Sequence, residues 1–159
     1  MLRAFRSFSG RWNFTREILH KNNNERFSVN GIAKFQQLNV GDENTLQYQE
    51  EGVMKQLSNS QTFNITQRYI YQYDEPKDQI TVYFDENPKR LFHHLTTTTS
   101  VGEISNCQAV RGYHLCELDH YNATYQFLSD REFQIIYSVQ GPKKDYEIKT
   151  LFTKLDFIH

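Results

Sequence analysis

Apolar and polar residues alternate along most of the chain, in short runs that are separated by turn signals. The clearest run covers residues 61–73, in which Phe63, Ile65, Tyr69 and Tyr71 fall on one face. Alternate residues of a β-strand point to the same side of a sheet. Turns such as Glu75-Pro76-Lys77-Asp78 bound these runs with residue types that favour turns. The pattern therefore predicts an all-β domain.

The same pattern predicts ten strands with short connections, which favours up-and-down order. We expect them over residues 10–18, 25–38, 45–57, 61–73, 80–84, 90–97, 107–117, 120–128, 133–139 and 146–152. The third is interrupted at Glu50-Glu51-Gly52, residues 98–106 form a loop, and residues 2–8 form a short helical turn. Large sheets curl, and closure removes exposed edges. The expected architecture is a single antiparallel up-and-down β-barrel of about eight to ten strands. A two-sheet sandwich is the alternative.

Composition supports one folded domain over residues 1–159. The chain contains 12 Phe, 10 Tyr and 1 Trp, whereas disordered chains are poor in aromatic residues. Ten tyrosines also indicate an interior that is not purely apolar, because a buried hydroxyl requires a hydrogen-bond partner.

Charge and targeting signals exclude several classes. The formal net charge is −1 and no long basic run occurs, which argues against nucleic-acid or anionic-membrane binding. No apolar stretch approaches the ~20 residues of a membrane helix, and the amino terminus has no signal-peptide core. Two cysteines, Cys107 and Cys116, are too few for a disulfide scaffold. We expect reduced thiols and a soluble, cytoplasmic protein, and leave its oligomeric state open.

Gly10-Arg11-Trp12 at the start of the first strand resembles the Gly-x-Trp signature of lipocalin and calycin barrels. In those barrels the tryptophan closes one end, and a basic residue from the last strand stacks across it. The resemblance implies that Lys149 or Lys154 has this role here. Lysine in that position lacks the fork geometry of arginine.

A longer ordered set of motifs is similar to the domain-of-unknown-function 6314 family. The set comprises Gly10-x-Trp12-x-Phe14-x-Arg16, Phe92-His93, His114-x-Cys116-x-x-Asp119-x-Tyr121 and Gly141-Pro142-x-Lys144-Asp145-Tyr146. The resemblance implies a calycin-like barrel with Gly10, Trp12, Gly141, Pro142 and Lys144 as a structural signature. It implies no established activity.

Arg16 is in phase with Trp12 and Phe14, so it is expected to point inward. A buried guanidinium is costly unless it is paired. It could bind a ligand carboxylate or phosphate bidentately. It could equally form a structural pair with an interior glutamate such as Glu50, or reach the barrel mouth.

His114, Cys116 and Asp119 form the densest polar cluster, and three interpretations remain open. Cys116 and His114 could be a nucleophile and its base, oriented by Asp119. The trio could bind a metal, although its spacing matches no known zinc motif, and we assign no metal site. Alternatively, Asp119 caps a turn while the other two contact a ligand or have a structural role.

His93 and His94 are expected on opposite faces of one strand, with one of them inside. Several tyrosines fall on predicted inner faces, which favours a polar cavity over a dry core. They are Tyr48, Tyr69, Tyr71, Tyr73, Tyr125 and Tyr137.

The leading hypothesis is a barrel that binds a small, anionic or aromatic ligand, with the cofactor unknown. Its predicted contacts are Arg16, Tyr69, Tyr71, His93, His94, His114, Tyr121 and Tyr137. The first alternative is a small enzyme that uses His114, Cys116 and Asp119 as catalytic residues. A haem-binding barrel and a protein-interaction module are further alternatives.

Overall fold

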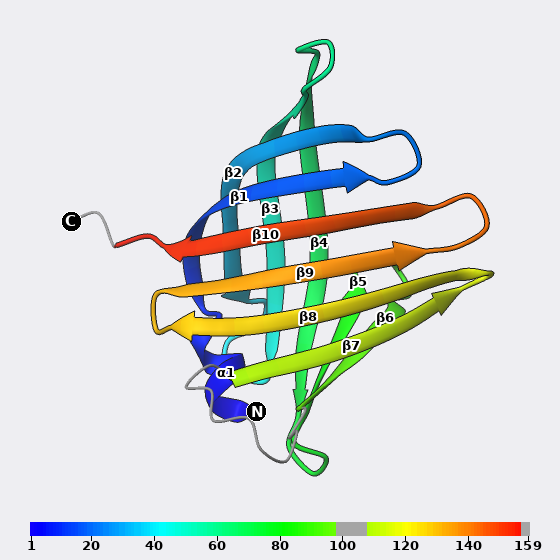
Figure 1. Ribbon diagram of the computed structural model, residues 1–159. Helices are drawn as coiled ribbons and strands as arrows, with labels where there is room; N and C mark the ends of the chain where they lie inside the picture. The colour runs from blue at the N-terminus through cyan, green and yellow to red at the C-terminus, as the bar shows by residue number, and fades with distance from the viewer. Residues whose placement is uncertain (98–107, 157–159) are drawn as a thin grey trace.

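The computed structural model describes residues 1–97 and 108–156, which form one short helix and ten strands (Figure 1). Their bounds are α1 Leu2–Ser7, β1 Gly10–His20, β2 Glu25–Gln37, β3 Thr45–Gln56, β4 Thr62–Asp74, β5 Gln79–Phe84, β6 Arg90–Thr97, β7 Gln108–Cys116, β8 Asp119–Ser129, β9 Glu132–Gln140 and β10 Asp145–Lys154. No helix among these residues is long and apolar enough to cross a bilayer.

Every strand pairs antiparallel with its neighbours in sequence, and β1 also pairs with β10. The result is a closed barrel, as the alternation predicts, and not a sandwich of two sheets. The predicted interruption of β3 is wrong, because Glu50, Glu51 and Gly52 all pair with both β2 and β4. The predicted loop over 98–106 and Cys107 lie outside the described residues.

Gly31 lies in the interior of β2, a strand that bends partway along its length (Figure 1). It pairs directly with Gly52, and the ladder continues through this point without a register shift. A side chain at Gly31 would overlap the backbone of β3 and would lie 2.7 Å from the ring of Phe14. Glycine is therefore required here for close approach, as strand glycines often are.

Helix α1 closes one end of the barrel. It buries Phe5, and the chain directly after it buries Phe8. The indole Nε1 of Trp12 donates a hydrogen bond of 2.8 Å to the carbonyl of Phe8. The Nζ of Lys154 lies 5.1 Å from the Trp12 ring centroid, so Lys154, and not Lys149, is the residue that stacks across the tryptophan.

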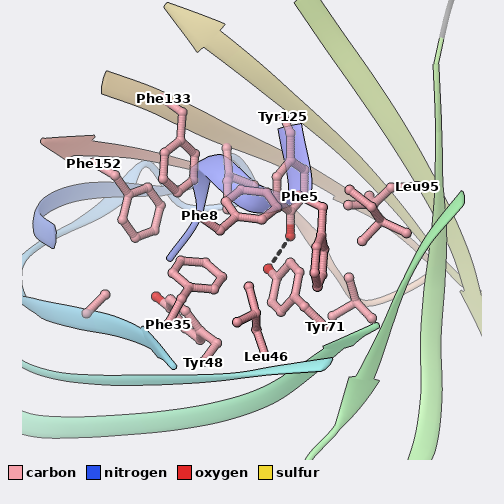
Figure 2. Packing of buried hydrophobic residues seen from close by; sticks show 14 of the residues in the cluster. Phe5, Phe8, Phe35, Leu46, Tyr48, Tyr71, Leu95, Tyr125, Phe133 and Phe152 are labelled. Atoms are coloured by element: carbon pink, nitrogen blue, oxygen red, sulfur yellow. Dashed lines mark hydrogen bonds between the residues drawn. The ribbon is translucent and has the colours of Figure 1, made fainter. Parts of the chain in front are cut away.

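Aromatic rings fill the half of the barrel next to α1 (Figure 2). Phe8 stacks on Phe35 with 4.9 Å between ring centroids, and Phe133 stacks on Phe152 at 4.4 Å. The hydroxyls of Tyr71 and Tyr125 hydrogen-bond at 2.5 Å within this packing (Figure 2). This half of the barrel is thus a close-packed core in which the buried tyrosine hydroxyls have hydrogen-bond partners.

Candidate functional site

A cavity of about 350 Å³ lies in the other half of the barrel, away from α1. Strands β4 to β10 contribute its walls, mostly through aromatic side chains. The lining residues are Tyr69, Phe84, Arg90, Phe92, His114, Cys116, Tyr121, Tyr137, Val139, Tyr146 and Ile148. Concave, mainly apolar sites with a few polar groups are typical of small-molecule binding.

A β-bulge in β6 helps to form this cavity. Val82 pairs with His93 but the next residue, Tyr83, pairs with Leu91, so Phe92 is the extra residue of the bulge. A bulge re-aims a side chain. As a result, both Phe92 and His93 are buried, although they are adjacent in sequence.

The cavity also adjoins a seam between β6 and β7. These strands pair only from Leu95–Gly112 to Thr97–Val110, and no pairing continues toward the end where β6 begins and β7 ends. The unpaired stretches carry Arg90 and Phe92 on β6 and His114 and Cys116 on β7, all of which line the cavity. The backbone pairing of the barrel wall is therefore interrupted where the cavity lies, and the rings of Phe92 and His114 meet across the gap.

The rings of the cavity are arranged as stacked walls with edges between them. Phe92 stacks on Phe84 at 4.6 Å and lies nearly parallel to Tyr137 at 5.9 Å. The His114 imidazole meets Phe92 edge-on at 5.3 Å and Tyr121 at 5.8 Å. Flat faces and edges of this kind complement a planar ligand.

Two paired cations adjoin the cavity: Arg90 lines it, and Lys144 contacts the lining residue Tyr121. The ammonium of Lys144 lies 3.0 Å from the Asp119 carboxylate and donates to the Tyr121 hydroxyl at 3.3 Å. The hydrogen bond to Asp119 raises the pKa of Lys144. Arg90 lies 3.1 Å from Glu86, and its guanidinium covers the ring of Phe84.

Arg16 does point inward, and it is held by protein groups. Its two terminal nitrogens bind the two oxygens of Glu50 at 2.8 and 2.9 Å, and its Nε donates to Thr150 at 2.8 Å. The Tyr48 hydroxyl donates to the same carboxylate at 2.7 Å. Burial lowers the pKa of Arg16, but hydrogen bonding to Glu50 and its charge bring the net change upward. The geometry is that of the structural pair with Glu50, one of the three possibilities for this residue.

His114 and Cys116 are brought together at the cavity, but Asp119 faces a different partner. His114 and Cys116 line the cavity, and Cys116 is exposed at its mouth. Asp119 lies opposite Cys116 in the β7–β8 ladder, and its carboxylate is engaged by Lys144. Within the described residues, no group of three or more potential metal ligands occurs.

The two adjacent histidines lie on opposite faces. His93 is inside and 2 % exposed, with its Cδ2 only 2.6 Å from where a β-carbon on Gly112 would be. Its Nε2 is buried without a hydrogen-bond partner among the described residues. Burial, followed by the neighbouring His114, lowers the pKa of His93 to about 3. His94 is outside and pairs with the Thr81 hydroxyl at 2.9 Å.

The tyrosines divide between the two halves of the barrel. Tyr69 and Tyr137 line the cavity, whereas Tyr71 and Tyr125 belong to the packed core. Burial raises the pKa of Tyr137 well above its ordinary value. Tyr73 also belongs to the packed core, against Phe5, and its hydroxyl donates to Asp78 at 2.6 Å. The predicted polar cavity is therefore lined by only part of the tyrosine set.

The sequence pattern of one family matches residues 8–154, which is nearly the whole chain. The protein belongs to this family of unknown function, DUF6314. No curated protein matches the sequence.

Among solved structures, this DUF6314 protein is similar to the S-type phycobiliprotein lyase CPES from Guillardia theta. The TM-score is 0.66 at 9 % identity, over 99 % of this chain and 93 % of the lyase. It is also similar to a redesigned β-barrel, mFAP0, bound to DFHBI, with a TM-score of 0.45 at 10 % identity over 93 % of this chain and 99 % of that one. At such identity the likeness to the lyase establishes the calycin-like fold alone.

Three of the four motifs that resemble those of DUF6314 contribute to the cavity and its mouth, whereas Gly10-x-Trp12-x-Phe14-x-Arg16 belongs to the packed core and the ion pair with Glu50. Phe92, His114, Cys116 and Tyr121 line the cavity, as does Tyr146. Gly141 leaves room for the Asp119 carboxylate, which a side chain there would overlap, and Lys144 binds that carboxylate. The signature Gly141-Pro142-x-Lys144 thus shapes the mouth of the cavity through Asp119.

Sequence reasoning missed several lining residues: Phe84, Arg90, Phe92, Val139, Tyr146 and Ile148. For some of them, the alternation of apolar and polar residues does indicate an inward-facing side chain. Val139 is in phase with Tyr137, and Ile148 is in phase with Tyr146, so both pairs share an inner face. Phe92 had no such signal, because it faces inward only through the bulge.

Proposed function

We propose that this barrel binds a small molecule with a planar aromatic or conjugated part in the cavity next to the β6–β7 seam. The observation that carries the proposal is the cavity itself, about 350 Å³ and walled by stacked rings. Its volume is at the lower end of the roughly 300–1,000 Å³ found for ligand pockets. A ligand of modest size therefore fits best.

The polar groups at the mouth support a ligand with one polar or anionic end. Lys144 and Arg90 are the cations there, each shared with an exposed or half-buried carboxylate. An anionic group could exchange places with Glu86 on Arg90 at little cost, because exposed ion pairs contribute only about 0–1 kcal/mol. Arg16 does not support anion binding in the same way, since Glu50 already neutralises it.

The seam offers a route into the cavity. A fully hydrogen-bonded barrel wall would have to break several backbone hydrogen bonds to admit a ligand through its side. Residues 90–94 of β6 and 113–116 of β7 do not pair with each other, so a ligand entering between them breaks no β6–β7 pairing. The ligand would pass between Phe92 and His114, whose rings meet edge-on at 5.3 Å across this seam and would have to move apart.

Titration with 8-anilinonaphthalene-1-sulfonate, an aromatic anion, tests the site by isothermal calorimetry. His114→Trp enlarges a side chain inside the cavity, whereas Leu115→Trp enlarges its exposed neighbour on the same strand. We expect one saturable site in the wild type and in Leu115→Trp. In His114→Trp the affinity should fall at least about tenfold, equivalent to 1.4 kcal/mol. Equal affinity in the two variants would place the site elsewhere.

The enzymatic alternative rests on Cys116 and His114 at the same cavity. Asp119 gives it little support, because Lys144 and not His114 holds the carboxylate. If Cys116 were an activated nucleophile, it would react with iodoacetamide faster than a free thiol at neutral pH. If the cavity is a binding site, Cys116 should react at an ordinary rate, and bound 8-anilinonaphthalene-1-sulfonate should slow the reaction.

A further inference from the structure

Strand β4 extends beyond the strand that follows it. β3 pairs with β4 from Thr62 to Gln72, but β5 pairs with it only from Tyr69 to Asp74. Residues 62–68 therefore have a strand partner on one side alone within the described part of the chain. The hairpin between β3 and β4 projects past the other hairpins of the barrel (Figure 1).

The backbone groups at this free edge can be identified. Tyr73 N–H donates to the Asn44 carbonyl, and the Gln61 carbonyl accepts from Gln56 N–H, so odd-numbered residues of β4 face β3. Successive residues of a strand direct their N–H and C=O groups to opposite sides. The corresponding groups of Asn64 and Thr66 consequently face away from β3, into open space.

The edge carries little of the usual protection against pairing. Exposed edge strands are normally blunted by lysine, proline, inward charges or bulges. Residues 62–68 read Thr-Phe-Asn-Ile-Thr-Gln-Arg, and the β3–β4 ladder has no register shift. The one charge is Arg68, which lies 3.8 Å from Asp85 at the end of the segment. Phe63 is 38 % exposed, so apolar surface accompanies the free backbone.

A surface groove reaches this edge. It measures about 1010 Å³ and runs across the outer side of β1 to β3, past Arg11, Lys34 and Glu51, to Thr66 and Arg68 of β4 and to Glu86 beyond β5. The charged residues lining it carry both signs, among them Arg68, Arg90, Asp85 and Glu86. The mixed charges therefore favour a nearly uncharged strand over a strongly acidic or basic partner.

We infer that residues 62–68 form a self-association surface, on which a second copy of this chain adds its own β4 edge in antiparallel orientation. Pairing centred on Ile65 places Asn64 opposite Thr66 and Thr62 opposite Arg68. No like charges then face each other, which is a condition for favourable cross-strand pairs. The two-fold arrangement is closed, since both copies use the same patch. A seven-residue edge is small, so the dimer is reversible and depends on concentration.

Sedimentation equilibrium of the full chain over a wide range of concentrations tests this surface. The average mass should rise from the 19.0 kDa of one chain toward twice that value. Thr66→Pro removes an edge-facing N–H that makes no bond to β3, so it should remain monomeric with an intact barrel. Thr66→Ala keeps the N–H and should dimerise like the wild type. Circular dichroism and the thermal midpoint check that both variants fold.

Amide hydrogen exchange on the wild type tests the same inference without a substitution. The amides of Asn64 and Thr66 should exchange more slowly at high protein concentration, while that of Ile65, bonded to β3, stays protected throughout. A single-chain mass at every concentration would overturn the inference. So would dimerisation of folded Thr66→Pro equal to that of Thr66→Ala, or exchange at Asn64 and Thr66 that does not depend on concentration.

Discussion

The two halves of this barrel use the same residue types in opposite ways. Near α1, Phe8 is fully buried and contacts five aromatic rings, and the hydroxyls of Tyr71 and Tyr125 bond to each other. At the other end, Phe84 and Tyr137 are only half-buried, because they border the cavity. Stability is therefore expected to reside in the first half, and binding in the second.

The difference originates in two local features of the chain. The short helix at the amino terminus supplies Phe5 and Phe8, which fill one end of the barrel. The bulge at Phe92 and the end of β6–β7 pairing at Leu95 keep the other end open. A binding barrel needs both ends, because the packed end stabilises the fold and compensates for the packing that the open end lacks.

The largest effect is expected from truncating the aromatic that fills the closed end. Phe8→Ala should lower the free energy of unfolding by about 3–5 kcal/mol, because it leaves a cavity in close packing. Phe84→Ala in the cavity wall should cost only about 1 kcal/mol. Urea denaturation of both variants gives the two values. Equal losses would contradict the division into two halves.

Breaking the interior ion pair should have a nearly comparable effect. Glu50→Ala leaves the Arg16 guanidinium without its carboxylate and should cost about 3–5 kcal/mol. Glu51→Ala changes the exposed neighbour on the outer face and should alter stability by about 0.5 kcal/mol or less. A small loss in Glu50→Ala, measured in urea, would show that the pair does not support the fold.

The buried side chain of His93 makes the stability of the fold depend on pH. The pKa of His93 is about 3 in the folded state, against 6.5 for an ordinary histidine. Between these values the unfolded chain binds the extra proton, so stability falls as the pH falls. Linkage gives a loss of about 2 kcal/mol between pH 7.5 and pH 5 from this residue.

His93→Leu should remove that contribution, and His94→Leu, on the outer face, should retain it. The measurement is the free energy of unfolding of both variants at the two pH values. A pH dependence in His93→Leu that equals that of His94→Leu would mean that His93 titrates normally.

The smallest effect is expected where Lys154 covers Trp12. Cation–π contacts contribute about 0.5–2 kcal/mol, and Lys154 is only partly buried, so Lys154→Met should cost about 0.5–1 kcal/mol. Trp12 is the single tryptophan of the chain, so its fluorescence should shift as well. Lys149→Met, on an exposed position of the same strand, should leave the spectrum unchanged. A fluorescence shift in Lys149→Met would mean that Lys149 contacts Trp12, which would contradict the assignment to Lys154.

Much of the fold could be predicted from alternation and turn residues, since each strand buries one face. The inward position of Arg16 followed from its phase with Trp12, and Glu50 was one of its expected partners. The continuity of β3 was not predicted, because glycine and paired glutamates weaken the strand signal. In the structure Gly52 is used for close approach to Gly31.

The site was harder to predict, because it depends on what fills the barrel and not on which way residues face. Tyr69 and Tyr71 have the same phase on one strand, yet one lines the cavity and the other lies in the core. Only the position of α1 distinguishes them. Phe92 and His93 both face inward through a bulge, which simple alternation excludes.

The most direct test of a binding half is native mass spectrometry of the protein freshly purified from cells. The wild type and Leu115→Trp should carry a small molecule of constant mass that is lost on denaturation, and His114→Trp should lack it. An absorption spectrum of the same sample would identify a conjugated ligand or haem. The same adduct on His114→Trp, or a bare wild-type mass together with no saturable binding of 8-anilinonaphthalene-1-sulfonate, would contradict the account.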